Sequence, residues 1–192
     1  MKNLERRIIA RTFVAEETTY ANGEVANNRL KSERLEDDPE LFEEVLCGLA
    51  RLALTFEPDT ITYVPNGARM FAEPVAEQLG LPVAHMIKEP DGPTAVGKMC
   101  IAPRSRRIIL AANRLVIVED VSRTFSQTNR VLGMEGVAEV AVGEVSILHR
   151  GSPEAHQGIV IPVKSLATRY LPPQMSNPQL EFYNSWAAEI GT

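Results

Sequence analysis

Two adjacent acids near the middle of the chain are followed by a turn rich in hydroxyl groups. Glu119 and Asp120 end the apolar run 115–118, and residues 122–128 lead from them into a predicted helix. Carboxylates can hydrogen-bond the vicinal hydroxyls of a sugar and lie close to a hydrated Mg²⁺. Free N–H groups at a helix start, helped by Ser and Thr hydroxyls, can hold a phosphate. A ribose 5-phosphate is one ligand that would satisfy both halves of this segment.

Alternating strand and helix patterns surround this segment and must position it. Strands are predicted at residues 60–64, 82–87, 115–118 and 137–148, the last as one strand or two. Helices are predicted at residues 68–79 and 126–132. Pro74 suits the first of these helices only with a late start or a kink. Apolar strands that alternate with helices indicate a parallel sheet with helices on both faces.

Three loops are expected to meet at one edge of this sheet, because ligands of open parallel sheets bind beyond the carboxyl ends of the strands. These loops are residues 65–69, 88–107 and 119–128. The middle loop contains a long irregular stretch, residues 89–105, rich in proline and glycine. Irregular loops of that length inside a compact domain are usually functional or mobile.

A further helix is predicted to begin after Asp38, which can cap it, with Pro39 at the first helical position. Its apolar face comprises Leu41, Val45, Leu49, Leu52 and Ala53. Cys47 falls inside this apolar pattern and is expected to be buried. Neither cysteine has a second Cys or a His at metal spacing, so a zinc site is not predicted.

The two ends of the chain differ from the alternating middle. Residues 8–14 are prone to form a strand, and Asn22 with Gly23 is typical of a hairpin turn, so small strands outside the main sheet are expected. After residue 162 the pattern breaks down into an extended segment and a short helix, residues 178–190. The expected organisation is a domain over residues 1–164, which includes a hood-like segment at 1–36. A C-terminal extension over 165–192 would pack on the body or on a second subunit.

Composition limits the classes of protein that fit. The chain has 192 residues, of which 44% are hydrophobic, and a formal net charge of -5. A generic nucleic-acid surface would be broadly basic, so nucleic acid is not an expected partner, although a local basic site remains open. The first nine residues include four charged side chains, and no apolar run is long enough to span a bilayer. A soluble, cytoplasmic protein with no membrane partner is expected.

The segment 116–128 resembles the phosphoribosyl pyrophosphate (PRPP) motif of type I phosphoribosyltransferases, in which an acidic pair and a short hydroxyl-rich loop follow an apolar strand. Three other segments extend the resemblance. Residues 64–69 are similar to the pyrophosphate loop of that family, and residues 87–89 and 29–38 are similar to segments of its orotate branch. The resemblance covers roughly residues 21–163. It implies a parallel-sheet α/β fold with helices on both faces, small hood-like N-terminal strands and a C-terminal extension.

The resemblance also implies roles for particular residues. Glu119 and Asp120 would hold the ribose hydroxyls, and Lys98 would close over the leaving diphosphate from a mobile loop. The 5-phosphate would be held by Arg123, Thr124, Phe125, Ser126, Gln127 and Thr128. The diphosphate would be held by Asn66, Gly67, Ala68, Arg69 and Lys88. Mg²⁺ would arrive with the ligand and lie near Asp120, not bound directly by side chains. PRPP or a nucleotide, together with a nucleobase, would be the substrates of a homodimer.

The loop departs from the family pattern at three positions. Phe125 stands where the family usually has glycine, and Ser122 and Arg123 replace an apolar residue and a threonine. Arg123 can bind phosphate with its guanidinium, or it can pair with Glu119 or another acid. Two functions therefore remain open. One is phosphoribosyl transfer between pyrophosphate and a nucleobase, and the other is a catalytically inactive nucleotide-binding, regulatory or structural protein.

Overall fold

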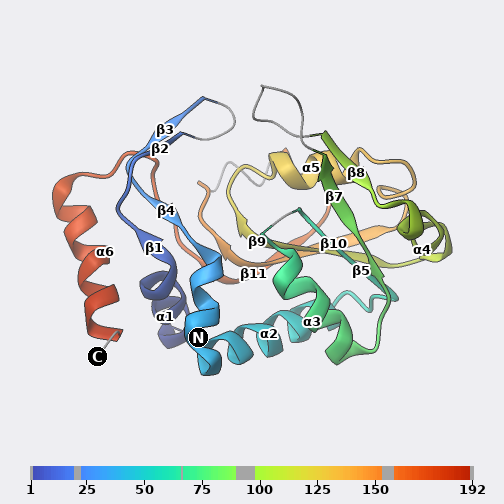
Figure 1. Cartoon of the computed structure of the whole chain (residues 1–192), viewed down its shortest axis with the longest axis horizontal. Coiled ribbons are helices and arrows are strands. Elements are labelled where there is room, and N and C mark those ends of the chain that lie inside the picture. Colours follow the sequence, from blue (N-terminus) through green and yellow to red (C-terminus); the bar gives the residue numbers. More distant parts are fainter. Residues whose placement is uncertain (1, 20–22, 66, 90–97, 153–157, 191–192) are drawn as a thin grey trace.

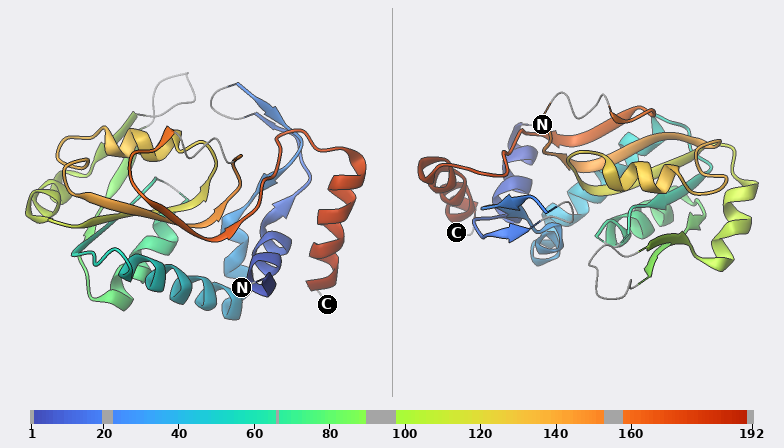
Figure 2. Two further views of the ribbon diagram at one scale, coloured as in Figure 1. Left: turned by 180° about the vertical axis from the view of Figure 1, so that it is seen from behind. Right: turned by 90° about the horizontal axis from the view of Figure 1, so that it is seen from above.

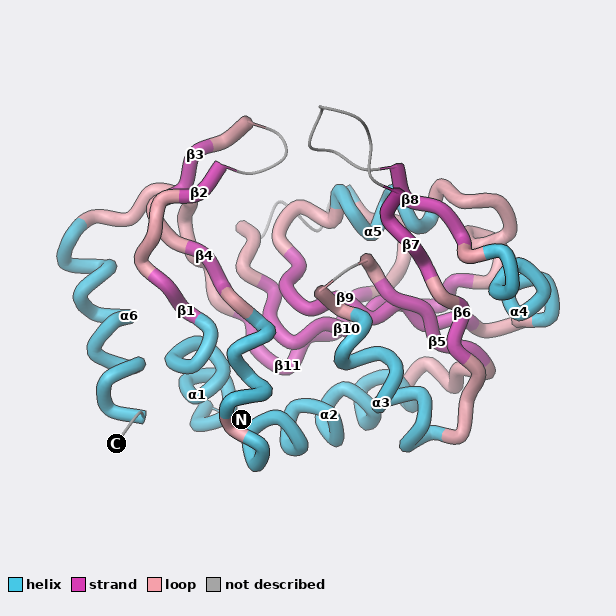
Figure 3. Tube along the Cα trace, in the orientation of Figure 1, coloured by secondary structure: helices cyan, strands magenta, loops and turns pink. Residues whose placement is uncertain are grey.

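A central sheet of five parallel strands forms the body of the protein (Figures 1 and 3). In spatial order the strands are β11 (Val163–Thr168), β10 (Ala141–His149), β9 (Leu115–Ser122), β5 (Thr60–Tyr63) and β6 (Val83–Ala84). Every neighbouring pair is parallel. The computed structural model describes residues 2–19, 23–65, 67–89, 98–152 and 158–190. The sheet confirms the α/β fold predicted from the alternating pattern.

Helices cover both faces of this sheet, as Figure 1 shows. The long helix α2 (Pro39–Leu54) and α3 (Arg69–Leu79) lie against one face, and α5 (Ser126–Leu132) lies above the other. The short helix α4 (Arg106–Ala111) lies at the β6 end. Helix α3 runs through Pro74 and buries four apolar residues of its inner face. No helix of the described residues is long and apolar enough to cross a bilayer.

Strand β9 is the buried centre of the sheet. Its first four side chains, predicted to form a strand, are fully buried. The strand continues four residues further than predicted, through Glu119 and Asp120 to Ser122, because β10 pairs with it as far as His149. The acidic pair therefore lies inside the last part of a strand and not in the loop beyond it.

Four short N-terminal strands form a separate layer beside the body, here called the hood (residues 13–30). They form two antiparallel pairs, β1 (Phe13–Val14) with β4 (Arg29–Leu30) and β2 (Thr18–Thr19) with β3 (Val25–Ala26). This layer confirms the small strands expected outside the main sheet. A short 3-10 helix, η1 (Ser32–Asp37), then leads into α2.

The expectation of a strand at residues 8–14 was wrong for most of that range. Residues up to Thr12 belong to the helix α1 (Lys2–Thr12), and only the next two residues form a strand, β1. Ile8 and Ile9 are both buried, yet they belong to two different apolar clusters. Consecutive residues point about 100° apart on a helix, so one short helix can reach both clusters. A short apolar run does not by itself distinguish strand from helix, and packing on both sides decided it here.

The segment expected to be irregular at 89–105 is partly a β-ribbon. β8 (Lys98–Ile101) pairs antiparallel with β7 (Met86–Glu89), and a 3-10 turn, η2 (Pro103–Ser105), follows. The predicted strand at 82–87 is also divided, because β6 joins the main sheet whereas β7 belongs to this ribbon. Residues 90–97 lie outside the described residues.

The C-terminal segment contributes more to the body than its sequence pattern indicated. β11 forms the outer strand of the main sheet and spans residue 164, the expected end of the compact domain. The predicted helix at 178–190 is confirmed as α6 (Asn177–Ile190), which packs against α1 (Figure 2). The rings of Phe13 and Tyr183 lie 5.1 Å apart between hood and helix.

Cys47 is exposed, so the expectation that it is buried was wrong. The apolar face of α2 is formed by residues such as Val45 and Leu49, both fully buried. Cys47 stands two positions from each of them, which on a helix places it on the opposite side. Its Sγ donates to Glu43 Oε1 over 3.4 Å.

Helix α2 positions the sheet from below, and its first turn is capped. The Asp38 Oδ1 accepts a hydrogen bond from Leu41 N over 3.0 Å. We expect Asp38→Ala to lower the free energy of unfolding by about 1 kcal/mol, because an orphan N–H of the first turn loses its acceptor. Chemical denaturation measures this change. Asp37→Ala, at the exposed neighbouring position, is the matched control, and an equal loss in both variants would contradict the capping role.

Candidate functional site

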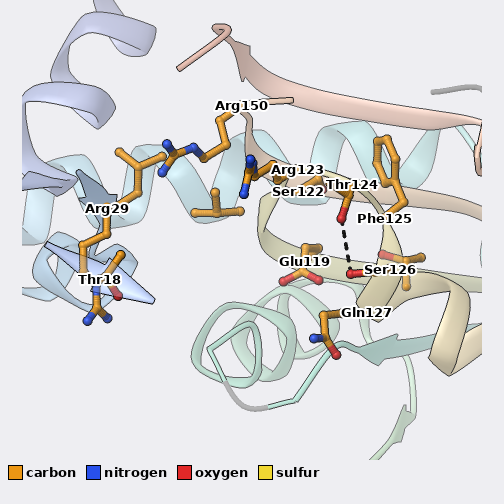
Figure 4. A pocket seen from close by; sticks show the side chains of 13 residues that line it. Thr18, Arg29, Glu119, Ser122, Arg123, Thr124, Phe125, Ser126, Gln127 and Arg150 are labelled. Atoms are coloured by element: carbon orange, nitrogen blue, oxygen red, sulfur yellow. Dashed lines mark hydrogen bonds between the residues drawn. The ribbon is translucent and has the colours of Figure 1, made fainter. Parts of the chain in front are cut away.

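A pocket of about 610 Å³ lies between the hood and the carboxyl end of β9 (Figure 4). The hood contributes Thr18, Arg29 and Leu30, and the other described lining residues are Glu119, Val121, Ser122, Arg123, Thr124, Phe125, Ser126, Gln127, Thr128 and Arg150. The pocket therefore collects nearly the whole segment that the sequence singled out. It lies where parallel sheets bind their ligands, beyond a strand's carboxyl end.

The residues 122–128, here called the 122–128 loop, turn from β9 directly into α5. The first hydrogen bond of the helix runs from Asn129 N to Phe125 O over 2.8 Å. The amides of the residues between them have no acceptor within the helix, because the first N–H groups of any helix precede its first carbonyl partner. The Thr124 and Ser126 hydroxyls lie 3.3 Å apart beside these amides (Figure 4). Together they form a set of donors suited to an anion.

Phe125 adopts the backbone conformation that glycine would be expected to supply. Its φ is 56° and its ψ is 13°, in the left-handed region. The side chain is only 3% exposed, and its ring stacks on His149 with centroids 5.0 Å apart and planes 9° apart. Figure 4 shows the ring directed away from Glu119 and Gln127. The replacement of glycine therefore leaves the turn intact and does not fill the pocket.

Positive charge predominates among the charged side chains that line the pocket. The described lining contains three arginines, Arg29, Arg123 and Arg150, and one acid, Glu119. Arg29 also pairs with Glu16 over 3.4 Å. Arg150 is buried, and its guanidinium donates to Asn28 Oδ1 over 2.7 Å and to Leu171 O over 3.0 Å. A local basic site thus exists on a chain of net charge -5. This balance favours an anionic ligand.

Arg123 pairs with an acid of the hood, which answers one question that the sequence left open. Its two terminal nitrogens lie 2.8 and 2.9 Å from the two carboxylate oxygens of Glu24. This two-point contact is the geometry in which guanidinium also binds phosphate. A phosphate could therefore replace the carboxylate of Glu24 and make the same two-point contact with Arg123.

Two buried acids lie next to the loop. Burial raises the pKa of Glu119 well above its usual value near 4.5, and the neighbouring Asp120 raises it further. Burial likewise raises the pKa of Glu144 on β10, although the Ser122 hydroxyl donates to that carboxyl and opposes the effect. A protonated Glu119 carboxyl can both donate and accept a hydrogen bond, which suits a neutral hydroxyl of a ligand.

Asp120 is not among the described residues that line the pocket, although its neighbour Glu119 is. Its Oδ2 accepts a hydrogen bond from the Ser32 hydroxyl over 2.5 Å. A Cβ added to Gly67 would lie only 2.4 Å from the same oxygen, so the predicted pyrophosphate loop packs directly on this acid. The structure therefore brings Gly67 and Asp120 together, and only a residue without a side chain fits between them.

The remaining predicted residues stand further from the pocket. Ala68 is buried at the start of α3, and Arg69 is exposed and pairs with Glu73 over 2.7 Å. Lys88 and Lys98 lie on the β7–β8 ribbon, and Lys98 is exposed. None of these four lines the pocket among the described residues. Asn66 lies outside the described residues.

Sequence reasoning missed Arg150 and the hood residues Thr18, Arg29 and Leu30, which complete the described lining of the pocket. Arg150 directly follows β10, and a residue just beyond the carboxyl end of a parallel strand is a candidate ligand contact. That position was the available signal. Thr18 carried no comparable signal, and Arg29 only began the segment 29–38 that resembles the orotate branch. The packing of the hood over the sheet brings both to the pocket.

The site is thus a hydroxyl-bearing turn at the carboxyl end of a parallel sheet, covered by a small antiparallel hood. No protein-family model matches the sequence, and no curated protein matches it. Solved structures, however, align over most of the chain. An orotate phosphoribosyltransferase from Aeropyrum pernix aligns with a TM-score of 0.61 and 15% identity, covering 94% of this chain and 98% of that one.

Two further structures support the same assignment. An adenine phosphoribosyltransferase from Thermoanaerobacter pseudethanolicus has a TM-score of 0.64 and 15% identity, covering 84% of this chain and 98% of that chain. A UMP synthase from Leishmania donovani has a TM-score of 0.64 and 14% identity, covering 98% of this chain and 42% of that chain. The chain therefore has the type I phosphoribosyltransferase fold, as the motif predicted.

The raised pKa of Glu119 predicts a pH dependence of stability. An acid whose pKa is higher in the folded than in the unfolded state stabilises the fold fully below the unfolded pKa, and the stabilisation is lost as the pH rises through the folded pKa. We expect the stability of the wild type to fall relative to Glu119→Gln as the pH rises from about 4.5 towards 8. Urea unfolding at a series of pH values measures the difference, and a difference that is constant with pH would contradict it.

Proposed function

We propose that this protein binds a phosphoribosyl compound, PRPP or a nucleotide, and transfers the phosphoribosyl group between pyrophosphate and a nucleobase. One observation carries the proposal. The 122–128 loop and Glu119 form one wall of a basic pocket at the carboxyl end of β9, within a fold shared with orotate and adenine phosphoribosyltransferases. A phosphate and a sugar hydroxyl are the groups that these two parts of the wall suit best.

Each part of the pocket has a proposed task. The hydroxyls and amides of the 122–128 loop hold the 5-phosphate, with Arg123 as a charged partner. Glu119 hydrogen-bonds a ribose hydroxyl. In the reaction a base nitrogen forms a bond to the anomeric carbon as the bond from that carbon to pyrophosphate breaks. Lys98, on the ribbon, would stabilise the negative charge of the leaving pyrophosphate, and the 67–69 segment with Asn66 and Lys88 would hold its phosphates.

Magnesium fits this site as an ion carried by the ligand. Mg²⁺ prefers oxygen ligands and usually keeps several waters, with one or two carboxylates and the phosphates of a substrate completing its shell. Asp120, beside Gly67, would lie near the ion without binding it directly, and the described residues contain no group of three or more acids, histidines or cysteines placed to hold a metal. The ion would neutralise charge on the diphosphate.

We propose a homodimer as the working assembly, with Lys98 acting on the site of the neighbouring subunit.

A second function, binding without turnover, is favoured by the environment of Asp120. Its carboxylate is engaged by Ser32 and covered by Gly67, and it does not line the pocket. An acid held in this way has to leave Ser32 before it can contact a ribose hydroxyl. If it does not, the protein would hold a nucleotide through the 122–128 loop and act as a regulatory or structural partner.

Calorimetry followed by an activity assay separates these functions. The protein is titrated with PRPP in the presence of Mg²⁺, and pyrophosphate release is then measured with a panel of nucleobases. Binding together with release for at least one base is expected. Binding without release for any base would support the silent nucleotide-binding protein, and the absence of binding would contradict phosphoribosyl transfer and favour a structural role.

The Arg123–Glu24 pair provides a sharper test with two variants of opposite effect. We expect Arg123→Ala to weaken the binding of ribose 5-phosphate about tenfold to a hundredfold, because a charge-assisted contact to phosphate is lost. Glu24→Gln should strengthen binding a few-fold, because the competing carboxylate becomes neutral. Calorimetry measures both affinities. Arg104→Ala, at an exposed arginine outside the pocket, is the control, and equal effects of all three variants would contradict a specific contact.

A further inference from the structure

Phe125 is in an unusual backbone state for a residue of its type. Among the described residues, only Phe125 and Glu57 have a positive φ without being glycine. A side chain with a Cβ is strained in this left-handed region, and a bulky residue especially so. Such strain persists only where the surrounding contacts offset it, and it is concentrated at functional sites. The contacts of Phe125 therefore indicate why the chain keeps this strained conformation.

The ring of Phe125 stacks on a residue of β10. His149 is the last residue of β10 and pairs in register with Ser122, the last residue of β9. The two rings are stacked nearly parallel, with centroids 5.0 Å apart. Because Phe125 is only 3% exposed, its ring has almost no free surface on which the base of a ligand could stack. The ring supports the loop from behind and does not read the ligand.

Further contacts tie the same loop to β10 and to the residues that follow it. Arg150 N donates to Ser122 O over 2.9 Å, and the Ser122 hydroxyl donates to Glu144. A Cβ added to Gly151 would lie 2.0 Å from the carbonyl oxygen of Arg123. Residues 122, 123 and 125 are thus in contact with β10 or with the two residues that follow it, Arg150 and Gly151. Of β10 and these two residues, only Arg150 lines the described pocket.

We propose that Phe125 is a positioning residue whose stack on His149 holds the 122–128 loop in its phosphate-binding shape before any ligand arrives. The inference rests on the proposed function, because it assigns the task of the loop to a phosphate. Glycine at this position would relieve the backbone strain, yet it would leave the loop without its anchor on β10. Glycine would adopt the left-handed backbone conformation freely, whereas Phe125 is held in it by packing. The loop therefore has its phosphate-binding shape before the ligand binds.

The first test compares Phe125→Gly with Phe125→Tyr, which keeps a ring able to stack. We expect Phe125→Gly to weaken the binding of ribose 5-phosphate about 3- to 10-fold, with a less favourable binding entropy, because the loop then has to be ordered by the ligand. Phe125→Tyr should bind within about 2-fold of the wild type. Equal or tighter binding by Phe125→Gly would show that the ring obstructs the loop, and it would overturn the proposal.

The second test needs no ligand and therefore separates the failure of this proposal from failure of the proposed function. The amides of Asn129 and Arg150 are bonded to Phe125 O and Ser122 O, so their hydrogen exchange reports on the loop. We expect faster exchange at both in unliganded Phe125→Gly, while Phe125→Tyr and the amides of β5 stay as in the wild type. Unchanged exchange in Phe125→Gly would overturn the positioning role even if the wild type binds ribose 5-phosphate. If the wild type binds no ribose 5-phosphate, the proposed function fails and exchange alone decides the role of Phe125.

A matched pair of glycine variants tests the anchor from the side of β10. Gly151→Ala should displace the Arg123 carbonyl and weaken ribose 5-phosphate binding in the same direction as Phe125→Gly, because the new methyl group would lie 2.0 Å from that carbonyl oxygen. Gly158→Ala is the control, because a Cβ there meets no atom within 4 Å. Wild-type affinity and exchange in Gly151→Ala would contradict the anchoring of the loop by this strand.

Discussion

The parallel pairing of β9 with β10 is the constraint on which the rest of the structure depends. The two strands run in register from Leu115 to Ser122, interrupted by one irregularity near Gly143. This pairing carries β9 beyond its apolar half and brings Glu119 to the pocket, where a strand end alone would leave two solvated acids. Parallel strands need long crossover connections, so the same pairing also requires α5 and fixes where it begins.

The pocket combines basic side chains at its surface with acids beneath it. Arg29, Arg123 and Arg150 line the space, whereas Glu144 is fully buried below the loop. Burying an ionised carboxylate is costly, and the raised pKa of Glu144 favours its neutral form. A neutral acid below the loop can accept the Ser122 hydroxyl without opposing the positive charge above it. The pocket thereby stays attractive to an anion while its support remains hydrogen-bonded.

The departures from the family motif have different consequences once the loop is seen in place. Phe125 preserves the turn, because stacking on His149 offsets a backbone conformation that glycine would adopt freely. Arg123 adds a positive charge, and its ion pair with Glu24 of the hood holds the side chain beside the pocket. Asp120 is the more consequential case, because it keeps the family's residue type but is engaged by Ser32. Residue identity and residue availability are therefore separate questions at this site.

Several features of the fold could be predicted from the sequence for local physical reasons. Apolar runs such as 115–118 can be stable only when buried, and Asp38 with Pro39 marks a helix start through a cap and a fixed φ. The order of the motifs then placed the 122–128 loop at the carboxyl edge of a parallel sheet, where the pocket lies. The less periodic segments were harder to interpret, since residues 8–14 are a helix and residues 98–101 are a strand.

The sequence by itself determined the fold class and identified the loop that forms one wall of the site. Both could be predicted because hydrophobic periodicity and turn chemistry act over short distances along the chain. The tertiary structure alone decided the partners of that loop. Glu24 lies 99 residues from Arg123, and the hydrogen bond between Ser32 and Asp120 spans 88 residues. Such contacts arise from the way hood and sheet pack together, and no local pattern encodes which side chains will meet.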